Sequence, residues 1–180
     1  MWVAAAAVWG LAEATLFFVV PDVLLSWLAA FRPRIVWLAV AACLAGALAG
    51  GFAMHAAGRD SPVTMRALLD RVPAVSPAFL SRTGAALEAG YGRQMLRAGF
   101  SGVPYKILAV ESGARGVKPG SFLAWSVPAR LPRWLLVVLV ARGVTMLVRA
   151  RSLQADRALW TLWAATWTTV YAIYFSVMGW

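Results

Sequence analysis

The sequence predicts an all-α membrane protein, and its composition and its long apolar stretches are the observations behind this prediction. Of the 180 residues, 62% are hydrophobic and 13% are charged, whereas a soluble domain is about 45–50% apolar and about 25% charged. A soluble fold of this size cannot bury so much apolar surface. The same numbers exclude a disordered chain, because disordered chains are poor in aromatic and aliphatic residues.

Three stretches are long enough to cross a bilayer, which takes about 20 mostly apolar residues in a helix. Residues 35–58 and residues 158–180 contain no Asp, Glu, Lys or Arg. Residues 118–148 are mostly apolar but include three arginines. We expect each of the three stretches to form a spanning helix, the last one at the C-terminal end of the sequence.

The first apolar block, residues 1–31, is interrupted. Pro21 removes a backbone donor and disfavours helix at the residue before it, and Asp22 follows at once. The two arms, roughly residues 3–19 and 23–30, are too short or too broken for an easy crossing. We therefore predict a re-entrant hairpin, with a spanning helix kinked at Pro21 as the alternative.

Residues 94–114 form a second interrupted block with the same organisation. The run from Val20 to Leu25 aligns with the run from Val103 to Leu108, which places Pro104 opposite Pro21. A predicted spanning helix follows each block. Because one spanning helix separates the two hairpins, they should enter from opposite faces of the membrane as an inverted repeat, an arrangement that points to a transport site at the midplane.

Residues 59–93 form a polar loop with several charged residues and three prolines. Short interfacial helices are expected at residues 64–69 and 78–87. No composition shift marks a second domain, so residues 1–180 are predicted to form a single integral membrane domain.

Six of the ionisable residues inside the predicted membrane segments are candidates for a site: Glu13, Asp22, Lys106, Glu111, Arg130 and Arg133. Each costs about 2.5–3.5 kcal/mol to insert, so such residues face the protein interior, pair with one another or mark a pathway. Arg130 and Arg133 are three residues apart and share a helix face. We expect both to point between the hairpins, within reach of Glu13, Asp22 or Glu111.

Two interpretations of these charges stay open. In the first, they form structural ion pairs that hold the hairpins together. In the second, Glu13, Asp22, Lys106, Arg130 and Arg133 line a wet transport cavity, where the bases hold a phosphate and the acids exchange protons.

Several other classes of function find no support. The formal charge of +10 is explained by basic residues that flank membrane segments and meet anionic lipid headgroups, so no nucleic-acid partner is predicted. The single Cys43 excludes an intrachain disulfide, and no catalytic or metal-binding motif is present, so neither enzymatic activity nor a cofactor is expected.

The small residues Gly46, Gly50 and Gly51 predict close helix packing.

The order of these motifs resembles the DedA family, also called SNARE-associated or VTT-domain proteins, and within it the YqaA-like branch. The first hairpin resembles that branch in Glu13-Ala14-Thr15, Phe17-Phe18 and Pro21-Asp22-Val23-Leu24-Leu25, and the first span in Gly46, Gly50, Gly51 and Gly58-Arg59. The second hairpin and the next span resemble it in Tyr91-Gly92, Phe100, Pro104-Tyr105-Lys106, Gly113, Phe122, Arg130 and Arg133. The resemblance covers residues 9 to 142.

The resemblance implies two opposed re-entrant hairpins packed among spanning helices, in a bacterial inner membrane. It also implies movement of lipids, since members of the family move phospholipids or the polyprenyl phosphate carrier. We therefore expect a lipid transporter or scramblase with membrane lipids as its partners and a proton as a coupling ion. The alternatives are a small-ion or solute transporter of the same architecture, and a membrane assembly or structural factor.

Overall fold

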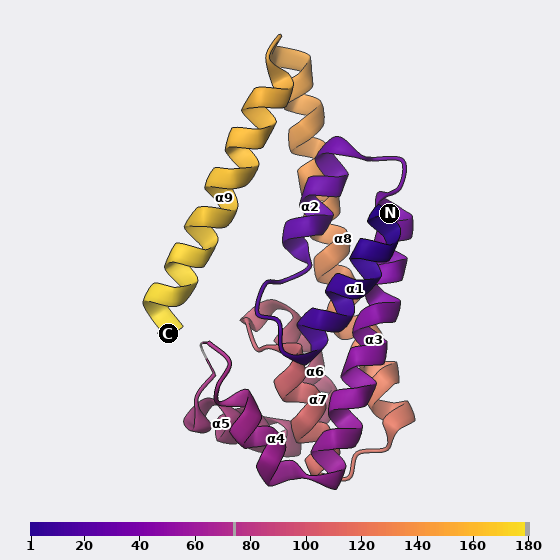
Figure 1. Ribbon diagram of the computed structural model, residues 1–180, viewed down its shortest axis with the longest axis vertical. Helices are drawn as coiled ribbons and strands as arrows, with labels where there is room; N and C mark the ends of the chain where they lie inside the picture. Colours follow the sequence, from indigo (N-terminus) through magenta and orange to yellow (C-terminus); the bar gives the residue numbers. More distant parts are fainter. Residues whose placement is uncertain (74, 179–180) are drawn as a thin grey trace.

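The computed structural model describes residues 1–73 and 75–178, and within these ranges the chain forms nine helices and no strands (Figure 1). The all-α prediction is therefore confirmed. In chain order the helices are α1 (Trp2–Thr15), α2 (Asp22–Phe31), α3 (Val36–Asp60), α4 (Pro62–Leu69), α5 (Pro77–Ala89), α6 (Tyr91–Ser101), α7 (Tyr105–Ala114), α8 (Pro119–Arg151) and α9 (Ala155–Met178).

Two of these helices, α3 and α8, are long and apolar enough to cross a membrane. Only 17% of the most apolar part of α8 is buried inside the protein, whereas the core helix of a soluble protein would be mostly buried. Both observations favour association with a membrane. Helix α9 has 24 residues but does not reach the same hydropathy, because Trp, Tyr and Thr make up much of it. Its crossing of a membrane stays a prediction, and residues 179–180 of the predicted span lie outside the described residues.

Helices α1 and α2 form an antiparallel hairpin, which we call hairpin 1. In Figure 1, α1 descends from the N-terminus and α2 returns, and the N-terminus lies beside the start of α3. The break between the helices runs over residues 16–21, which is longer than predicted because α1 ends at Thr15. Backbone groups of this break bind side chains from other helices, as described below.

Helices α6 and α7 form the second hairpin, hairpin 2, with a break at residues 102–104. Gly102 takes a left-handed backbone conformation there, with φ of 77°. The hairpin begins at Tyr91, slightly before the predicted residue 94. Helices α4 and α5 each begin at a proline, as is common in the first turn, and extend slightly beyond the predicted interfacial helices.

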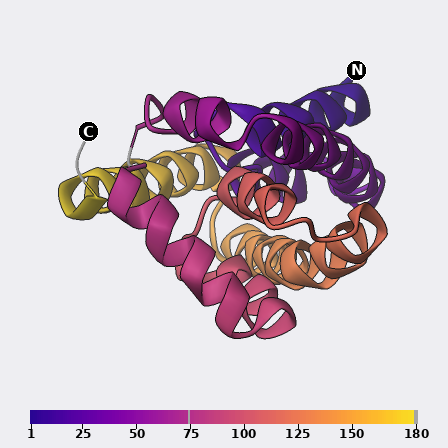
Figure 2. The same ribbon diagram turned by 90° about the horizontal axis from the view of Figure 1, so that it is seen from below.

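Each hairpin contacts both long helices, α3 with one arm and α8 with the other. Helix α1 packs on α3 and α6 packs on α8, so each first arm contacts the long helix of its own half. Helix α2 packs on α8 and α7 packs on α3, so each second arm contacts the long helix of the other half. Helix α7 lies at the centre in the end-on view of Figure 2, and its residues from Tyr105 to Gly113 are all buried.

Glycines allow the closest of these contacts. A Cβ atom at Gly46 would collide with the backbone carbonyl of Ala7, and one at Gly50 would lie 2.7 Å from the carbonyl oxygen of Leu11. Both glycines therefore bring α3 against the backbone of α1. Gly51 faces the ring of Tyr105, so it serves the contact of α3 with α7.

Candidate functional site

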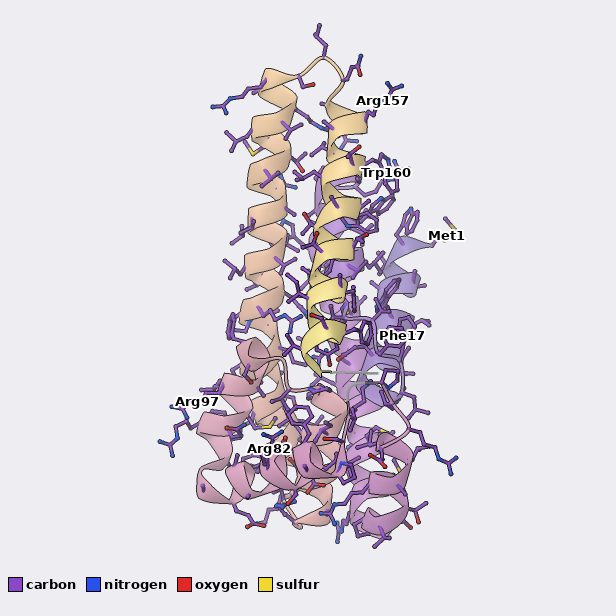
Figure 3. The ribbon with its side chains drawn as sticks, turned by 90° about the vertical axis from the view of Figure 1, so that its left-hand side faces the viewer. Met1, Phe17, Arg82, Arg97, Arg157 and Trp160 are labelled. Carbon is purple, nitrogen blue, oxygen red and sulfur yellow. The ribbon has the colours of Figure 1, made fainter. Side chains whose placement is uncertain are left out.

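A cavity of about 180 Å³ lies where the breaks of the two hairpins meet. Its lining includes Pro21 from hairpin 1 and Pro104 from hairpin 2, and all five residues predicted for a transport site: Glu13, Asp22, Lys106, Arg130 and Arg133. Phe17, which lies in the break of hairpin 1, is near the middle of the long axis of the molecule, between Arg157 toward one end and Arg82 toward the other (Figure 3). The charged residues of the cavity therefore lie near the middle of this axis.

Glu13 on α1 pairs with Arg130 on α8. The Arg130 guanidinium donates to Oε2 of Glu13, and both side chains are almost fully buried. The guanidinium carbon lies 4.2 Å from the ring centre of Tyr105 and 4.7 Å from that of Trp134. Two aromatic faces thus hold the cation beside its carboxylate. The Nε of Arg130 is buried and has no hydrogen-bond partner among the described residues.

Asp22, the first residue of α2, pairs with Arg133 on α8. Nε and Nη2 of Arg133 donate to Oδ1 and Oδ2 of Asp22, each at 2.9 Å. The side chain of Asp22 is 2% exposed and that of Arg133 is 31% exposed. The acid also lies in the first turn of α2, where the helix dipole favours a negative charge.

Lys106 has no such carboxylate partner. It is 2% exposed, and its Nζ donates to the carbonyl of Phe17 at 2.7 Å. Among the described residues, no carboxylate oxygen lies within 4.0 Å of it. Three basic and two acidic side chains line the cavity, so the basic side chains outnumber the acidic ones by one.

The broken backbone of hairpin 1 is satisfied by side chains of α1, α7 and α9. Trp9 Nε1 donates to the carbonyl of Val19 at 3.0 Å, and the hydroxyl of Tyr171 on α9 accepts from the Val20 amide at 2.9 Å. Lys106 binds the carbonyl of Phe17, as described above. Non-helical backbone at membrane depth requires such partners, since lipid offers none. These bonds explain why α1 ends at Thr15 rather than continuing to the proline.

Glu111 lies outside the cavity, on the face of α7 that meets α4 and α5. Its Oε1 accepts from Nε of Arg66 at 2.7 Å, and its Oε2 accepts from Arg66 and Arg115. The hydrogen bond with Glu111 raises the pKa of Arg66. Of the three acids considered from the sequence, Glu13 and Asp22 meet Arg130 and Arg133 of α8, whereas Glu111 pairs with other arginines.

Aromatic residues complete the site and were missed from the sequence. Tyr105 and Trp134 hold Arg130, and Tyr171 caps the break. Trp134 follows Arg130 by four residues, a spacing that places both on one helix face. Tyr171 had no comparable signal, because nothing in the sequence tells which part of the chain α9 contacts.

Comparison of the chain with known protein families, with curated proteins and with solved structures finds no match.

Proposed function

We propose that the chain is an integral membrane protein that moves lipids, as a transporter or scramblase of the DedA type, in a bacterial cytoplasmic membrane. In this proposal α3, α8 and α9 cross the bilayer, and the two hairpins enter it from opposite faces. Membrane lipids with phosphate headgroups are the cargo.

The packing of the helices supports an inverted repeat. Each half has a broken hairpin followed by a long helix, and the contacts of one half with the other are reciprocal. In Figure 1 the break of hairpin 1 points toward hairpin 2, while both ends of hairpin 1 lie at the same end of the molecule. Interrupted segments at matching positions in two halves are typical of a transport site near the midplane.

The observation that carries the proposal is that Lys106 is buried in the cavity with no carboxylate of the described residues within 4.0 Å. An ammonium group has three donors, and one of them is used by the carbonyl of Phe17. Burying a charge without a counter-ion is costly, so a site that keeps one is suited to an anionic ligand. A phosphate headgroup supplies a counter-ion, and its oxygens match the planar donor forks of Arg130 and Arg133.

The two carboxylates provide a route to proton coupling. A phosphate that binds Arg130 competes with Glu13 for the same guanidinium. The pair of Glu13 and Arg130 is therefore the contact that headgroup binding would open, and the pH gradient in the experiment below tests whether a proton is the coupling ion.

Lipid movement in proteoliposomes tests the proposal. Purified protein is reconstituted with a fluorescent phospholipid, and the fraction bleached by external dithionite reports transfer between leaflets, with and without a pH gradient. We expect Lys106→Met to lose at least about tenfold in rate, as one lost charge-assisted contact allows. The matched control is Lys118→Met, which changes an exposed lysine outside the cavity. Equal rates for the wild type and Lys106→Met would contradict the proposal.

A further inference from the structure

Helix α9 forms one wall of the cavity. Trp167, Val170, Tyr171 and Tyr174 all contribute to the lining, opposite the arginines of α8. The described part of α9 packs mainly against α8 and α2, and in Figure 1 it runs down the outside of the bundle from its connection with α8. The cavity is therefore separated from the surroundings on this side by a single helix.

Polar contacts hold α9 to hairpin 1. Nε1 of Trp163 donates to the carbonyl of Val23 and to Oγ of Ser26, both at 3.2 Å. Nε1 of Trp167 donates to the same Oγ at 3.0 Å. Together with the bond from the Val20 amide to Tyr171, these contacts form a line of hydrogen bonds along the boundary between α9 and α2.

The other boundaries of the cavity are closed more firmly. Where α6 crosses α8, Gly99 brings backbone against backbone, because a Cβ atom there would collide with the carbonyl oxygen of Ala129, and both residues line the cavity. The boundary of α2 with α8 is closed by the bidentate pair of Asp22 and Arg133. Separating the cavity end of α9 from hairpin 1 breaks neutral hydrogen bonds, each with a modest net contribution, and the ring contact of Phe18 with Phe175, while Trp160 stays stacked on Phe31 near the connection with α8.

The cavity has both charged and apolar lining. Its charged residues include Arg130 and Arg133 on α8 with their carboxylate partners, whereas Phe18, Val75 and Val170 add apolar lining. The outer surface of α9 is also apolar, with Leu162, Ile173 and Val177 exposed. An amphiphile placed with its headgroup on Lys106 and its chain beside α9 would meet matching surfaces at both ends.

We propose that α9 is a lateral gate, and that the acyl chain of the lipid leaves the cavity between α9 and the break of hairpin 1. The helix turns about its connection with α8, near which Trp160 stacks on Phe31 with ring centres 5.0 Å apart. The bond between Val20 and Tyr171 latches the gate at its cavity end. This inference rests on the proposed function, since it assumes that the headgroup binds in the cavity.

Reversible bridging of the gate tests the inference. In a Cys43→Ala background, Ser26→Cys and Trp167→Cys are joined by a short bifunctional methanethiosulfonate reagent, and lipid movement is measured before bridging, after bridging and after reduction. We expect movement to stop on bridging and to return on reduction. Movement at an unchanged rate in the bridged protein would overturn the inference.

A second pair of variants keeps the test decisive if the double-cysteine protein is inactive before bridging. Tyr171→Phe removes the latch and leaves the Val20 amide without its partner in the closed state. If opening limits the rate, lipid movement rises roughly three- to tenfold, as the loss of one hydrogen bond allows. Tyr174→Phe is the matched control, because Tyr174 lines the cavity but makes no hydrogen bond with a described residue. Equal rates of lipid movement for Tyr171→Phe and Tyr174→Phe would overturn the proposal that the bond between Val20 and Tyr171 latches the gate.

The lysine variant separates the two proposals. If Lys106→Met stops lipid movement and bridging does not, the gate is wrong and the proposed function stands. If bridging stops movement and Lys106→Met does not, the headgroup site at Lys106 is wrong, and with it the proposed path from that site past α9. If neither change affects movement, both proposals fail.

Discussion

Arg133 and Asp22 form a bidentate ion pair between residues that lie 111 positions apart in the chain. The pair joins the start of α2 to the middle of α8, and thereby joins hairpin 1 to the long helix that follows hairpin 2. The two partners differ in burial: Asp22 is almost inaccessible, whereas part of Arg133 reaches solvent or the cavity. Because of this difference in burial, replacing Asp22 and replacing Arg133 should have different effects on stability.

Replacing Arg133 should destabilise the protein more than replacing Asp22 does. Arg133→Gln leaves a buried carboxylate without a counter-ion and should cost about 3 kcal/mol, within the range for broken buried pairs. Asp22→Asn leaves an arginine that can be solvated and should cost about 1 kcal/mol. Thermal unfolding of the purified variants in detergent measures both. The double variant should be more stable than Arg133→Gln alone, and a larger loss for Asp22→Asn would contradict this account.

Hairpin 1 should place the N-terminus and the start of α3 on the same side of the membrane. The structure brings the two together because α2 reverses the direction of α1. Single cysteines at Trp2 and Arg34, in a Cys43→Ala background, should therefore react with an impermeant maleimide from the same side. A cysteine at Asp60, at the far end of α3, should react from the other side. Labelling of Trp2 and Arg34 from opposite sides would show a kinked spanning helix instead.

Adding one methyl group at Gly46 should separate α1 from α3. The new Cβ would meet the carbonyl of Ala7, which as backbone cannot move without shifting the helix. Gly46→Ala should therefore cost about 1–3 kcal/mol, as overpacking does. Gly143→Ala on α8 is the control, since a Cβ there meets no atom within 4 Å. Its expected effect is neutral or a gain of up to about 1 kcal/mol from helix propensity. Equal unfolding temperatures for both variants would be inconsistent with the close crossing.

Glu111 should hold α7 to α4 far more strongly than its neighbour Glu88 does. Glu111 is buried and accepts from Arg66 and Arg115, whereas Glu88 pairs with Arg115 but is 66% exposed. Glu111→Gln should lower the free energy of unfolding by about 2 kcal/mol, and Glu88→Gln by less than about 0.5 kcal/mol. Denaturation followed by tryptophan fluorescence measures both. A comparable loss in Glu88→Gln would show that burial of Glu111 does not decide the effect.

Local properties of the chain were sufficient to predict the helices. The long run without charges at residues 35–58 corresponds to α3, and Pro21 and Pro104 lie at the breaks of the two hairpins. A proline lacks the backbone donor that a helix interior requires, so its effect depends on no distant residue. The same holds for the charges: the cost of placing six ionisable residues among apolar segments predicts that they gather inside the protein, whatever the fold.

Which acid pairs with which arginine depended on residues far apart in the chain. The sequence allowed Arg130 and Arg133 to meet Glu13, Asp22 or Glu111, and composition cannot rank these pairings. The crossing of α2 over α8 brings Asp22 to Arg133, and the packing of α7 against α4 takes Glu111 to Arg66. The same crossings leave Lys106 beside a carbonyl rather than a carboxylate.

The sequence by itself therefore determined which segments are helical, that the chain breaks beside Pro21 and Pro104, and which residue types must lie inside, because each of these follows from the chemistry of neighbouring residues. Contacts with distant residues set how long the break of hairpin 1 is. The tertiary structure alone decided which charges are paired, which basic side chain of the cavity has no carboxylate partner and which helix covers the cavity. These depend on distances between segments up to about 150 residues apart, such as the bond between Val20 and Tyr171. Such distances are set by how whole helices pack, which no local pattern encodes.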